Sequence, residues 1–178
     1  MIFKKTAVQG AFIIELNELQ DERGFFARAF CADEFAAHGL ETAFVQANIS
    51  QSNHKHTVRG MHMQTKPHGE TKLMRCTRGA VYDALIDLRP DSPTFHKWVG
   101  VELTADNHKM LYVPAGCAHG YQTLTDDAEV FYPVTAPYNA DSEIGIRWDD
   151  PFFGIDWPEK TNAIVSDKDK AWPLYETA

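Results

Sequence analysis

A short alternating stretch carries the first residues that could do chemistry. In Arg59-Gly-Met-His-Met-Gln64, period-two alternation predicts that His62 and Gln64 share one face with Gly60. Polar side chains that line the interior or mouth of a β-barrel mark a ligand site more often than a core. Imidazole exchanges protons near neutral pH and also ligates metals, so His62 is a candidate for proton transfer or metal binding. A lone histidine in a strand is more often a structural residue with a satisfied hydrogen bond.

Three further polar residues stand in comparable places. Lys72 comes just before an apolar run, His119 lies in a glycine-flanked loop at a strand edge, and Tyr132 lies within Val130-Phe-Tyr-Pro133. Each signal is weak alone, because lysines are usually solvated and tyrosines usually pack. A shared site requires that the fold bring these side chains together with His62.

Metal binding is the first alternative. His54 and His56 have the i, i+2 spacing that places two ligands on one face of a strand, but their segment is polar throughout and is expected to be an exposed loop. Gln64 stands where a second histidine after His62 would complete the same spacing, and Glu70 is the nearest acidic residue downstream. These features favour a site without a metal, and a metal-dependent β-barrel enzyme is kept as an alternative.

Short strands separated by turn clusters dominate the expected secondary structure. Within the stretch 81–88, Asp83 and Asp87 share one face with Val81 and Leu85. Strands are expected at Lys72–Thr77, Ala80–Leu88, Lys97–Leu103, Met110–Val113 and Val130–Thr135, and short helices at Ala32–His38 and Ser166–Ala171. Many short strands at regular spacing predict an all-β sandwich, jelly roll or barrel.

Composition limits the partners and the number of domains. The 178 residues, 44% of them hydrophobic, are predicted to form one domain over residues 1–178. The formal net charge of −8 argues against nucleic acid and anionic membranes as partners. The three cysteines contain no CxxC pair, and the N-terminus has no signal-peptide pattern, so we expect no disulfide framework and a cytoplasmic location.

Motifs along nearly the whole chain resemble those of the dTDP-4-dehydrorhamnose 3,5-epimerases, a family of cupin-type jelly-roll enzymes. The resemblance is specific because many matches occur in order and at the family's spacings. They include Asp21-Glu-Arg-Gly-Phe-Phe26, Val58-Arg-Gly-Met-His62, Asp87-Leu-Arg89, Ser92-Pro-Thr94, Ala118-His-Gly120, Arg147-Trp-Asp-Asp-Pro151, Gly154-Ile-Asp-Trp-Pro158 and Ser166-Asp-Lys-Asp169. The resemblance implies a cupin-type jelly roll and inversion of C3, C5 or both in a 4-keto-6-deoxy sugar nucleotide.

The resemblance also implies roles for four residues. His62 matches the base, and Asp169 matches the carboxylate that orients it and stabilises the imidazolium. Lys72 matches the cation beside the C4 oxygen, where negative charge develops, and Tyr132 matches the acid that returns a proton from the other face. No cofactor is implied, because the hydrogens on C3 and C5 are already acidified by the C4 ketone.

Further family positions are implied to bind the nucleotide. Matches to cationic phosphate-binding positions are Arg23, Arg59, His119 and Lys168, and matches to other binding positions are Phe26, Gln46, Asn48, Tyr138 and Glu143. Tyr138 matches the ring that stacks on the base. The family is homodimeric, so the resemblance implies a homodimer whose N-terminal strands cross to the partner and whose Arg23 segment helps to complete the neighbouring site.

Departures from the family pattern keep several functions open. Arg28 replaces a usual glutamate, Ala47 replaces a usual aspartate, Met63 replaces a common aromatic residue, and Pro133 replaces a usual basic residue. The first two changes make the expected nucleotide-binding segments more positive. The alternatives are an epimerase that inverts only C3 or only C5, one that acts on a non-thymidine nucleotide sugar, a metal-dependent cupin, and a non-catalytic binding cupin.

Overall fold

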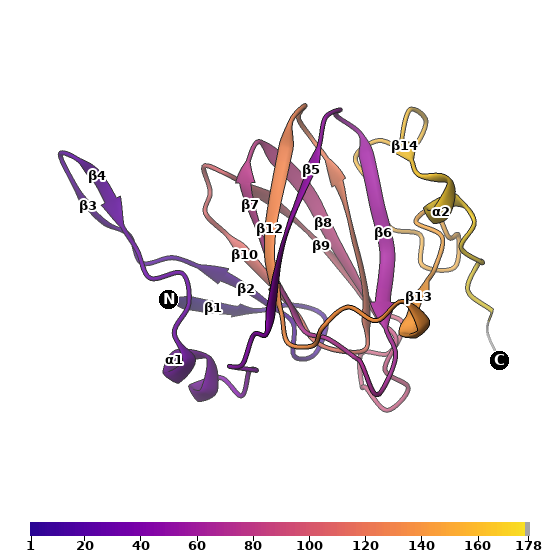
Figure 1. The fold of residues 1–178 in the computed structure, drawn as a ribbon, viewed down its shortest axis with the longest axis horizontal. Coiled ribbons are helices and arrows are strands. Elements are labelled where there is room, and N and C mark those ends of the chain that lie inside the picture. The colour runs from indigo at the N-terminus through magenta and orange to yellow at the C-terminus, as the bar shows by residue number, and fades with distance from the viewer. Residues whose placement is uncertain (177–178) are drawn as a thin grey trace.

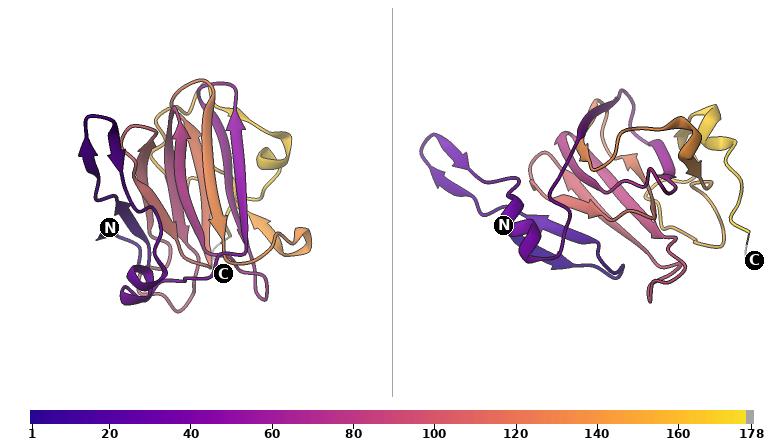
Figure 2. Two further views of the ribbon diagram at one scale, coloured as in Figure 1. Left: turned by 60° about the vertical axis from the view of Figure 1, so that its left-hand side comes forward. Right: turned by 60° about the horizontal axis from the view of Figure 1, so that its bottom comes forward.

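Two antiparallel sheets pack face to face in the computed structural model, which describes residues 1–176 (Figures 1 and 2). The first sheet has the order β1-β2-β10-β7-β12-β5, with β1 (Ile2–Lys5), β2 (Phe12–Glu15), β5 (Gln46–Ser52), β7 (Lys72–Arg78), β10 (Met110–Val113) and β12 (Ala128–Val134). The second has the order β13-β6-β11-β8-β9, with β6 (Thr57–Gln64), β8 (Ala80–Asp87), β9 (Trp98–Thr104), β11 (Cys117–Thr123) and β13 (Glu143–Gly145). A short parallel strand, β14 (Ile164–Val165), also pairs with β6. The predicted all-β class is confirmed.

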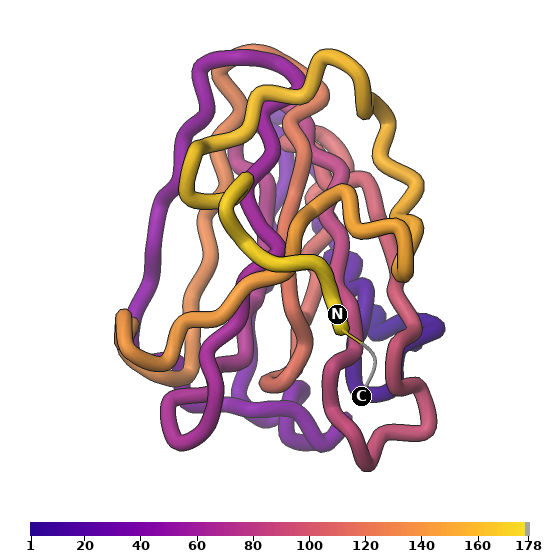
Figure 3. Tube along the Cα trace, turned by 90° about the vertical axis from the view of Figure 1, so that its right-hand side faces the viewer, coloured from indigo at the N-terminus to yellow at the C-terminus, as the bar shows by residue number. Residues whose placement is uncertain are grey.

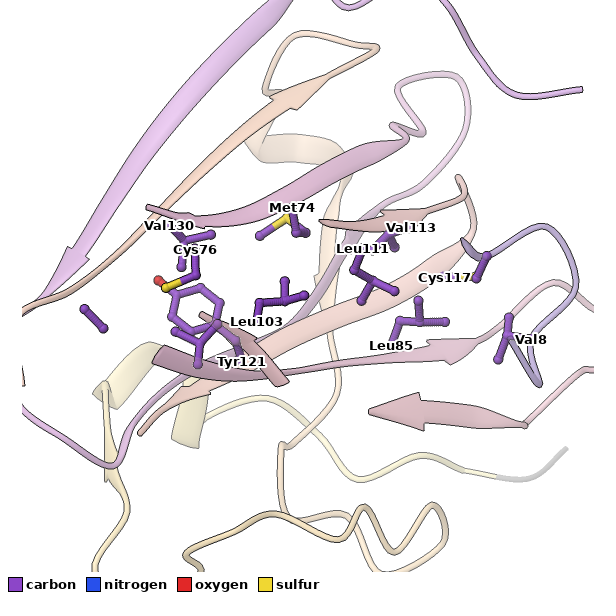
Figure 4. Packing of buried hydrophobic residues seen from close by; sticks show 13 residues of the cluster. Val8, Met74, Cys76, Leu85, Leu103, Leu111, Val113, Cys117, Tyr121 and Val130 are labelled. Carbon is purple, nitrogen blue, oxygen red and sulfur yellow. The ribbon is translucent and has the colours of Figure 1, made fainter. Parts of the chain in front are cut away.

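Alternation along β8 shows how the sequence fills the space between the sheets. Val81 and Leu85 lie in the cluster between the two sheets, with Leu103, Leu111 and Val130 (Figure 4). Ala84 and Ile86 belong to a second cluster on the other face of the same sheet. The predicted division of this strand into two faces is therefore confirmed, and each face is buried.

Segments from the two ends of the chain cover the outer faces of the sandwich. Phe35 of α1 (Ala32–Ala37) is fully buried in the outer cluster of the first sheet. Trp148 and Trp157 cover the second sheet, and the C-terminal segment continues across it into α2 (Asp167–Lys170) (Figure 3). Both predicted helices are present within the expected ranges. No helix within residues 1–176 has the length and apolarity that crossing a bilayer would need.

One hairpin stands apart from the sandwich. Strands β3 (Leu19–Asp21) and β4 (Gly24–Phe26) pair only with each other in the sheet topology, and the hairpin projects away from both sheets (Figures 1 and 2). Phe26 at its end is 73% exposed. The hairpin therefore carries apolar surface that the described part of its own chain leaves uncovered.

A register shift in β6 changes the predicted alternation around His62. His119 of β11 pairs with His62, but Tyr121 pairs with Arg59, so β6 carries one extra residue between these pairs. Arg59 and His62 therefore face the same cavity, and the prediction that Gly60 shares their face is wrong. Gly60 has φ +127°, and a Cβ there would lie 2.5 Å from the Cα of Gly120. Glycine at this position lets two strands approach while the chain turns Arg59 inward.

We predict that Gly60→Ala destabilises the protein more than Gly24→Ala does. Gly24 has a similar φ of +124°, but a Cβ added there would have nothing within 4 Å, so its substitution adds backbone strain alone, about 1–2 kcal/mol. Gly60→Ala adds a backbone clash to the same strain. Urea unfolding of both variants measures the difference, and equal losses of unfolding free energy would show that the close approach at Gly60 is not limiting.

The motifs around Asp87 form a structural clamp. Arg89 donates to both carboxylate oxygens of Asp87 at 2.8 Å, and the hydroxyls of Ser92 and Thr94 donate at 2.6 and 2.7 Å. Burial would raise the pKa of Asp87, but these donors lower it to about 2. The clamp fixes the turn between β8 and β9, which makes these family motifs structural.

We predict a pH-dependent contribution of Asp87 to stability. Its folded-state pKa lies below the ordinary value of 3.8, so its stabilisation is present above pH 4 and is lost as the pH falls toward 2. This shift corresponds to on the order of 2 kcal/mol. The unfolding free energy of Asp87→Asn, measured against wild type, is expected to differ most at pH 5–7 and to converge toward pH 2. Asp91→Asn, an exposed change in the same turn, is the control and is expected to show no such convergence.

Candidate active site

A cavity between the inner faces of the two sheets brings together the predicted catalytic residues. Its walls include His62 of β6 in the second sheet, and Lys72 of β7 and Tyr132 of β12 in the first. Asp169 reaches it from α2 at the C-terminal end of the chain. The predicted convergence of these four side chains is therefore present in the geometry, from elements that are far apart in sequence.

The closest contact in the cavity joins His62 and Asp169. The Nε2 atom of His62 lies 2.6 Å from a carboxylate oxygen of Asp169, whose residue is 5% exposed. Burial would raise the pKa of the Asp169 carboxyl, but the hydrogen bond and charge of His62, with a weaker contribution from the Gly60 backbone N–H, hold that pKa below its usual value. An ionised Asp169 accepts from Nε2–H and leaves Nδ1 as the proton acceptor.

The local sequence of α2 explains how Asp169 is presented. Ser166 caps the helix, because its hydroxyl accepts a hydrogen bond from the Asp169 backbone N–H at 3.1 Å. Strand β14, just before it, is paired with β6. The chain that carries the carboxylate is thus tied to the strand that carries the histidine.

Lys72 is held by an acidic partner that the sequence reasoning considered only as a metal ligand. Its Nζ lies 3.2 Å from Glu70, and both side chains are mostly buried. Gln64 in turn donates to Glu70 and to the carbonyl oxygens of His68 and Pro137. Gln64 is therefore a structural support for the loop before β7, and the ammonium group of Lys72 is fixed at the cavity wall.

Tyr132 provides a neutral hydroxyl group on the wall opposite His62. Burial raises the pKa of Tyr132, nearby Tyr121 and Glu70 raise it further, and Arg59 offsets part of the rise. Because the raised pKa lies above the ordinary value for a phenol, the side chain keeps its proton at neutral pH. It can therefore donate a proton to a carbanion or enolate carbon.

A second histidine–carboxylate pair lies beside the first. His119 pairs with His62 across β11 and β6, and its Nε2 lies 2.5 Å from Asp83 of β8. The His119 and Asp83 side chains are 7% and 0% exposed, against 26% for His62. Asp83 was not predicted as a site residue, and the signal for it was an acidic residue on the inward face of an apolar strand. This closed pair presents a fixed imidazole to the cavity.

The predicted binding residues within the sandwich surround the same cavity. Tyr138 and Lys168 both bond to Glu143, at 2.9 and 2.6 Å. The predicted residues that line the cavity are Gln46, Asn48, Arg59, His119, Tyr138, Glu143 and Lys168. Lys168 lines the part of the cavity that contains Arg59, and Tyr138 lines the part that contains the amide groups. Glu143 joins the two parts, because it bonds to both residues.

Two predicted binding residues lie outside the cavity of their own chain. Arg23 and Phe26 lie on the projecting β3–β4 hairpin, and Arg23 is 84% exposed in its side chain and paired with Asp21. Of the departures from the family pattern, Met63 lines the cavity, whereas Arg28 and Ala47 lie away from it. Arg28 pairs with Glu34 at 3.0 Å, and Ala47 lies on the outward face of β5, opposite to Gln46 and Asn48. Within one chain, neither departure changes the charge of the cavity wall.

The sequence spacing that suggested a metal does not produce a ligand cluster. His54 and His56 lie in the turn between β5 and β6, and His54 is exposed as expected. In the part of the chain that the structure describes, no three His, Cys, Asp or Glu side chains converge in a way that could hold a metal ion. The cavity carboxylates instead pair one by one with histidine or lysine.

Comparisons with a family model and with individual proteins point to the same family. The family model described as dTDP-4-dehydrorhamnose 3,5-epimerase matches residues 5–177. The dTDP-4-dehydrorhamnose 3,5-epimerase of Sinorhizobium fredii is 42% identical over 97% of this chain and 89% of its own length.

Solved structures extend the similarity to the fold. The epimerase of the same description from Elizabethkingia anophelis superposes with a TM-score of 0.95 at 38% identity, covering 98% of this chain and 96% of the other. A dTDP-6-deoxy-D-glucose-3,5-epimerase of Legionella pneumophila Philadelphia 1, in complex with dTDP-4-keto-L-rhamnose, has a TM-score of 0.90 at 37% identity and covers 97% and 92%. The cupin-like jelly roll expected from the resemblance is confirmed. The chain belongs to the dTDP-4-dehydrorhamnose 3,5-epimerase family, and it is an isomerase.

Proposed function

We propose that this chain inverts both C3 and C5 of dTDP-4-keto-6-deoxy-D-glucose and releases dTDP-4-keto-L-rhamnose, with no cofactor. The observation that carries the proposal is the placement of a paired histidine and a protonated phenol on opposite walls of one cavity, with the ammonium group of Lys72 on the same wall as the phenol. An inversion next to a ketone needs this combination: a base on one face, an acid on the other, and a cation for the oxyanion.

The proposed proton transfers balance at each centre. Nδ1 of His62 takes the proton from C3, the C3–H electron pair forms the C3–C4 double bond, and the C4 oxygen becomes an oxyanion beside Lys72. Tyr132 then donates its hydroxyl proton to C3 from the opposite face, and the C4 ketone re-forms. His62 returns its proton to water and the phenolate regains one from water, so the same sequence can follow at C5. Asp169 stabilises the imidazolium while it exists.

The binding roles follow from the charge and shape of the cavity. Arg59 and Lys168 are the cations placed for the diphosphate, His119 is an imidazole placed beside them, and Tyr138 is the ring placed to stack on the base. Arg28 and Ala47 lie away from the cavity of their own chain, so within one chain neither departure argues against thymidine. Inversion at one centre only is the competing function. A cytoplasmic location stays a prediction.

A homodimer is part of the proposal. Arg23 and Phe26 match substrate-binding positions but lie on a hairpin that projects from their own sandwich. A second copy would place this hairpin over its neighbour's cavity and cover the exposed Phe26 ring. Strand β2 pairs with the chain's own β10, and β1 pairs with β2, so the proposed exchange involves the β3–β4 hairpin rather than these two strands.

The first test is proton NMR of dTDP-4-keto-6-deoxyglucose with chelator-treated protein in deuterated water. We predict that deuterium enters both C3 and C5 at the untreated rate, and that His62→Ala lowers exchange at both centres at least about 100-fold, since it removes the base. Asp169→Asn is expected to lower exchange less, because it keeps the shape of the partner but not its charge.

Other outcomes of this experiment separate the competing functions. Exchange at one centre alone would replace the proposal by a single-centre epimerase. No exchange with folded protein, followed by exchange on a different nucleotide sugar, would exclude thymidine specificity. Loss of exchange on chelation, with recovery on adding a divalent metal, would favour the metal-dependent alternative. His54→Ala, an exposed histidine outside the cavity, is the control for substitution itself.

We predict that Tyr132→Phe separates exchange from inversion. Without the phenol, His62 can still remove a proton and return a deuteron to the same face, so deuterium wash-in persists while inverted product falls by about 100-fold or more. A coupled reductase specific for the inverted sugar measures the product, and NMR measures the wash-in. Equal losses of both would show that Tyr132 positions the substrate and does not supply the proton.

A further inference from the structure

Trp172 lies beside His62 and beside Lys168 of the helix that carries Asp169, although the sequence pattern gave no reason to select it. Its ring centroid lies 6.2 Å from that of His62 in an edge-on arrangement. The Nζ of Lys168, on α2, lies 5.8 Å from the same indole. One side chain therefore lies against the base and against the short helix that presents Asp169.

The backbone next to His62 is shaped to receive this indole. Gly145 of β13 pairs directly with His62 of β6. A Cβ on Gly145 would overlap three ring atoms of Trp172, closer than any real contact allows. The indole therefore packs flat onto the glycine backbone, and any larger residue at 145 would displace it.

The helix that carries Asp169 depends on its surroundings for its position. It has four residues, and a helix of that length is not stable alone. The chain is tied on one side by β14 and on the other by a bond from the Arg147 N–H to the Pro173 carbonyl oxygen at 3.0 Å. Between these ties, Trp172 is the large side chain that fills the space between the strand pair and the helix.

The contact works through packing. The indole N–H of Trp172 is buried and has no hydrogen-bond partner among the described residues. Because an unpaired buried donor is unfavourable, the N–H group does not stabilise the indole at this position. Its shape and its packing contacts do. A phenyl ring would keep most of the contact and remove the unpaired donor.

We propose that Trp172 is a positioning residue: its indole packs on Gly145 and thereby sets the separation of His62 and Asp169. This proposal rests on the function proposed above. A displaced indole would let α2 shift and lengthen the 2.6 Å contact. Misplacement of a reacting group by about 1 Å can cost on the order of 100-fold in rate. Lys168 keeps its own bond to Glu143, so nucleotide affinity should depend little on the indole.

The test compares Trp172→Ala, Trp172→Phe, Gly145→Ala and the double change Gly145→Ala with Trp172→Ala. We expect kcat for deuterium exchange to fall about 10- to 100-fold in Trp172→Ala and in Gly145→Ala. Trp172→Phe should stay within about threefold of wild type, and dTDP affinity should change less than about threefold in all four. The double variant should equal Trp172→Ala, because the added methyl group then meets no ring. Leu174→Ala, an exposed change in the same segment, is the control.

A substrate-free measurement keeps this proposal separate from the proposed function. The His62 Nε2 proton, hydrogen-bonded to Asp169, should give a downfield NMR signal in wild type and in Trp172→Phe that is lost in Trp172→Ala. An unchanged kcat or a retained signal in Trp172→Ala would overturn the proposal, as would additive losses in the double variant. If wild type itself fails to exchange deuterium, the proposed function fails, and the NMR signal alone decides the role of Trp172.

Discussion

The 2.6 Å contact between His62 and Asp169 is the interaction on which the rest of the site depends. It joins residues separated by 107 positions, and the connection is made only because the C-terminal segment returns across the second sheet. The parallel pairing of β14 with β6 and the serine cap of α2 make sense as supports for this contact. The core between the two sheets contains no residue of β14 or α2, so packing of this core does not require these elements. Their placement is instead a requirement of the site.

The two histidine–carboxylate pairs show how burial divides one chemical motif into two roles. His62 keeps about a quarter of its side-chain surface open, which a base needs in order to meet a substrate and then exchange its proton with water. His119 is nearly closed, and its partner Asp83 is fully buried with one oxygen unpaired among the described residues. A closed pair of this kind favours a fixed orientation over exchange, which suits binding more than proton transfer.

Sequence patterning was reliable where one physical rule acts alone. The strand 80–88 alternates without interruption, and its two faces were predicted correctly. Alternation failed at Gly60, because a bulge depends on the partner strand and not on the residues of β6 alone. Asp83 and Trp172 were missed for a related reason. In the sequence, Asp83 resembles an ordinary polar residue within an apolar strand, and Trp172 resembles an ordinary apolar residue. Their roles depend on neighbours that are distant in sequence. Glu70 was considered only as a metal ligand, because the loop that turns its carboxylate toward Lys72 at the start of β7 has a shape that the sequence does not reveal.

Charge pairing in the cavity bears on the oligomeric state. Lys72, His119 and Lys168 each face a carboxylate of their own, respectively Glu70, Asp83 and Glu143, and His62 faces Asp169. Within residues 1–176, Arg59 is the cavity cation whose bonds go to neutral groups, the Ser52 hydroxyl and the Gln51 carbonyl oxygen. One uncompensated cation is a poor match for a diphosphate with about two negative charges. The chain's net charge of −8 offers no general attraction in compensation. The projecting hairpin of a neighbouring copy would bring Arg23 to the site. Its pairing with Asp21 is solvent-exposed and therefore weak, so a phosphate can take the place of Asp21, and the electrostatics of the cavity favour the proposed dimer independently of the exposed apolar surface.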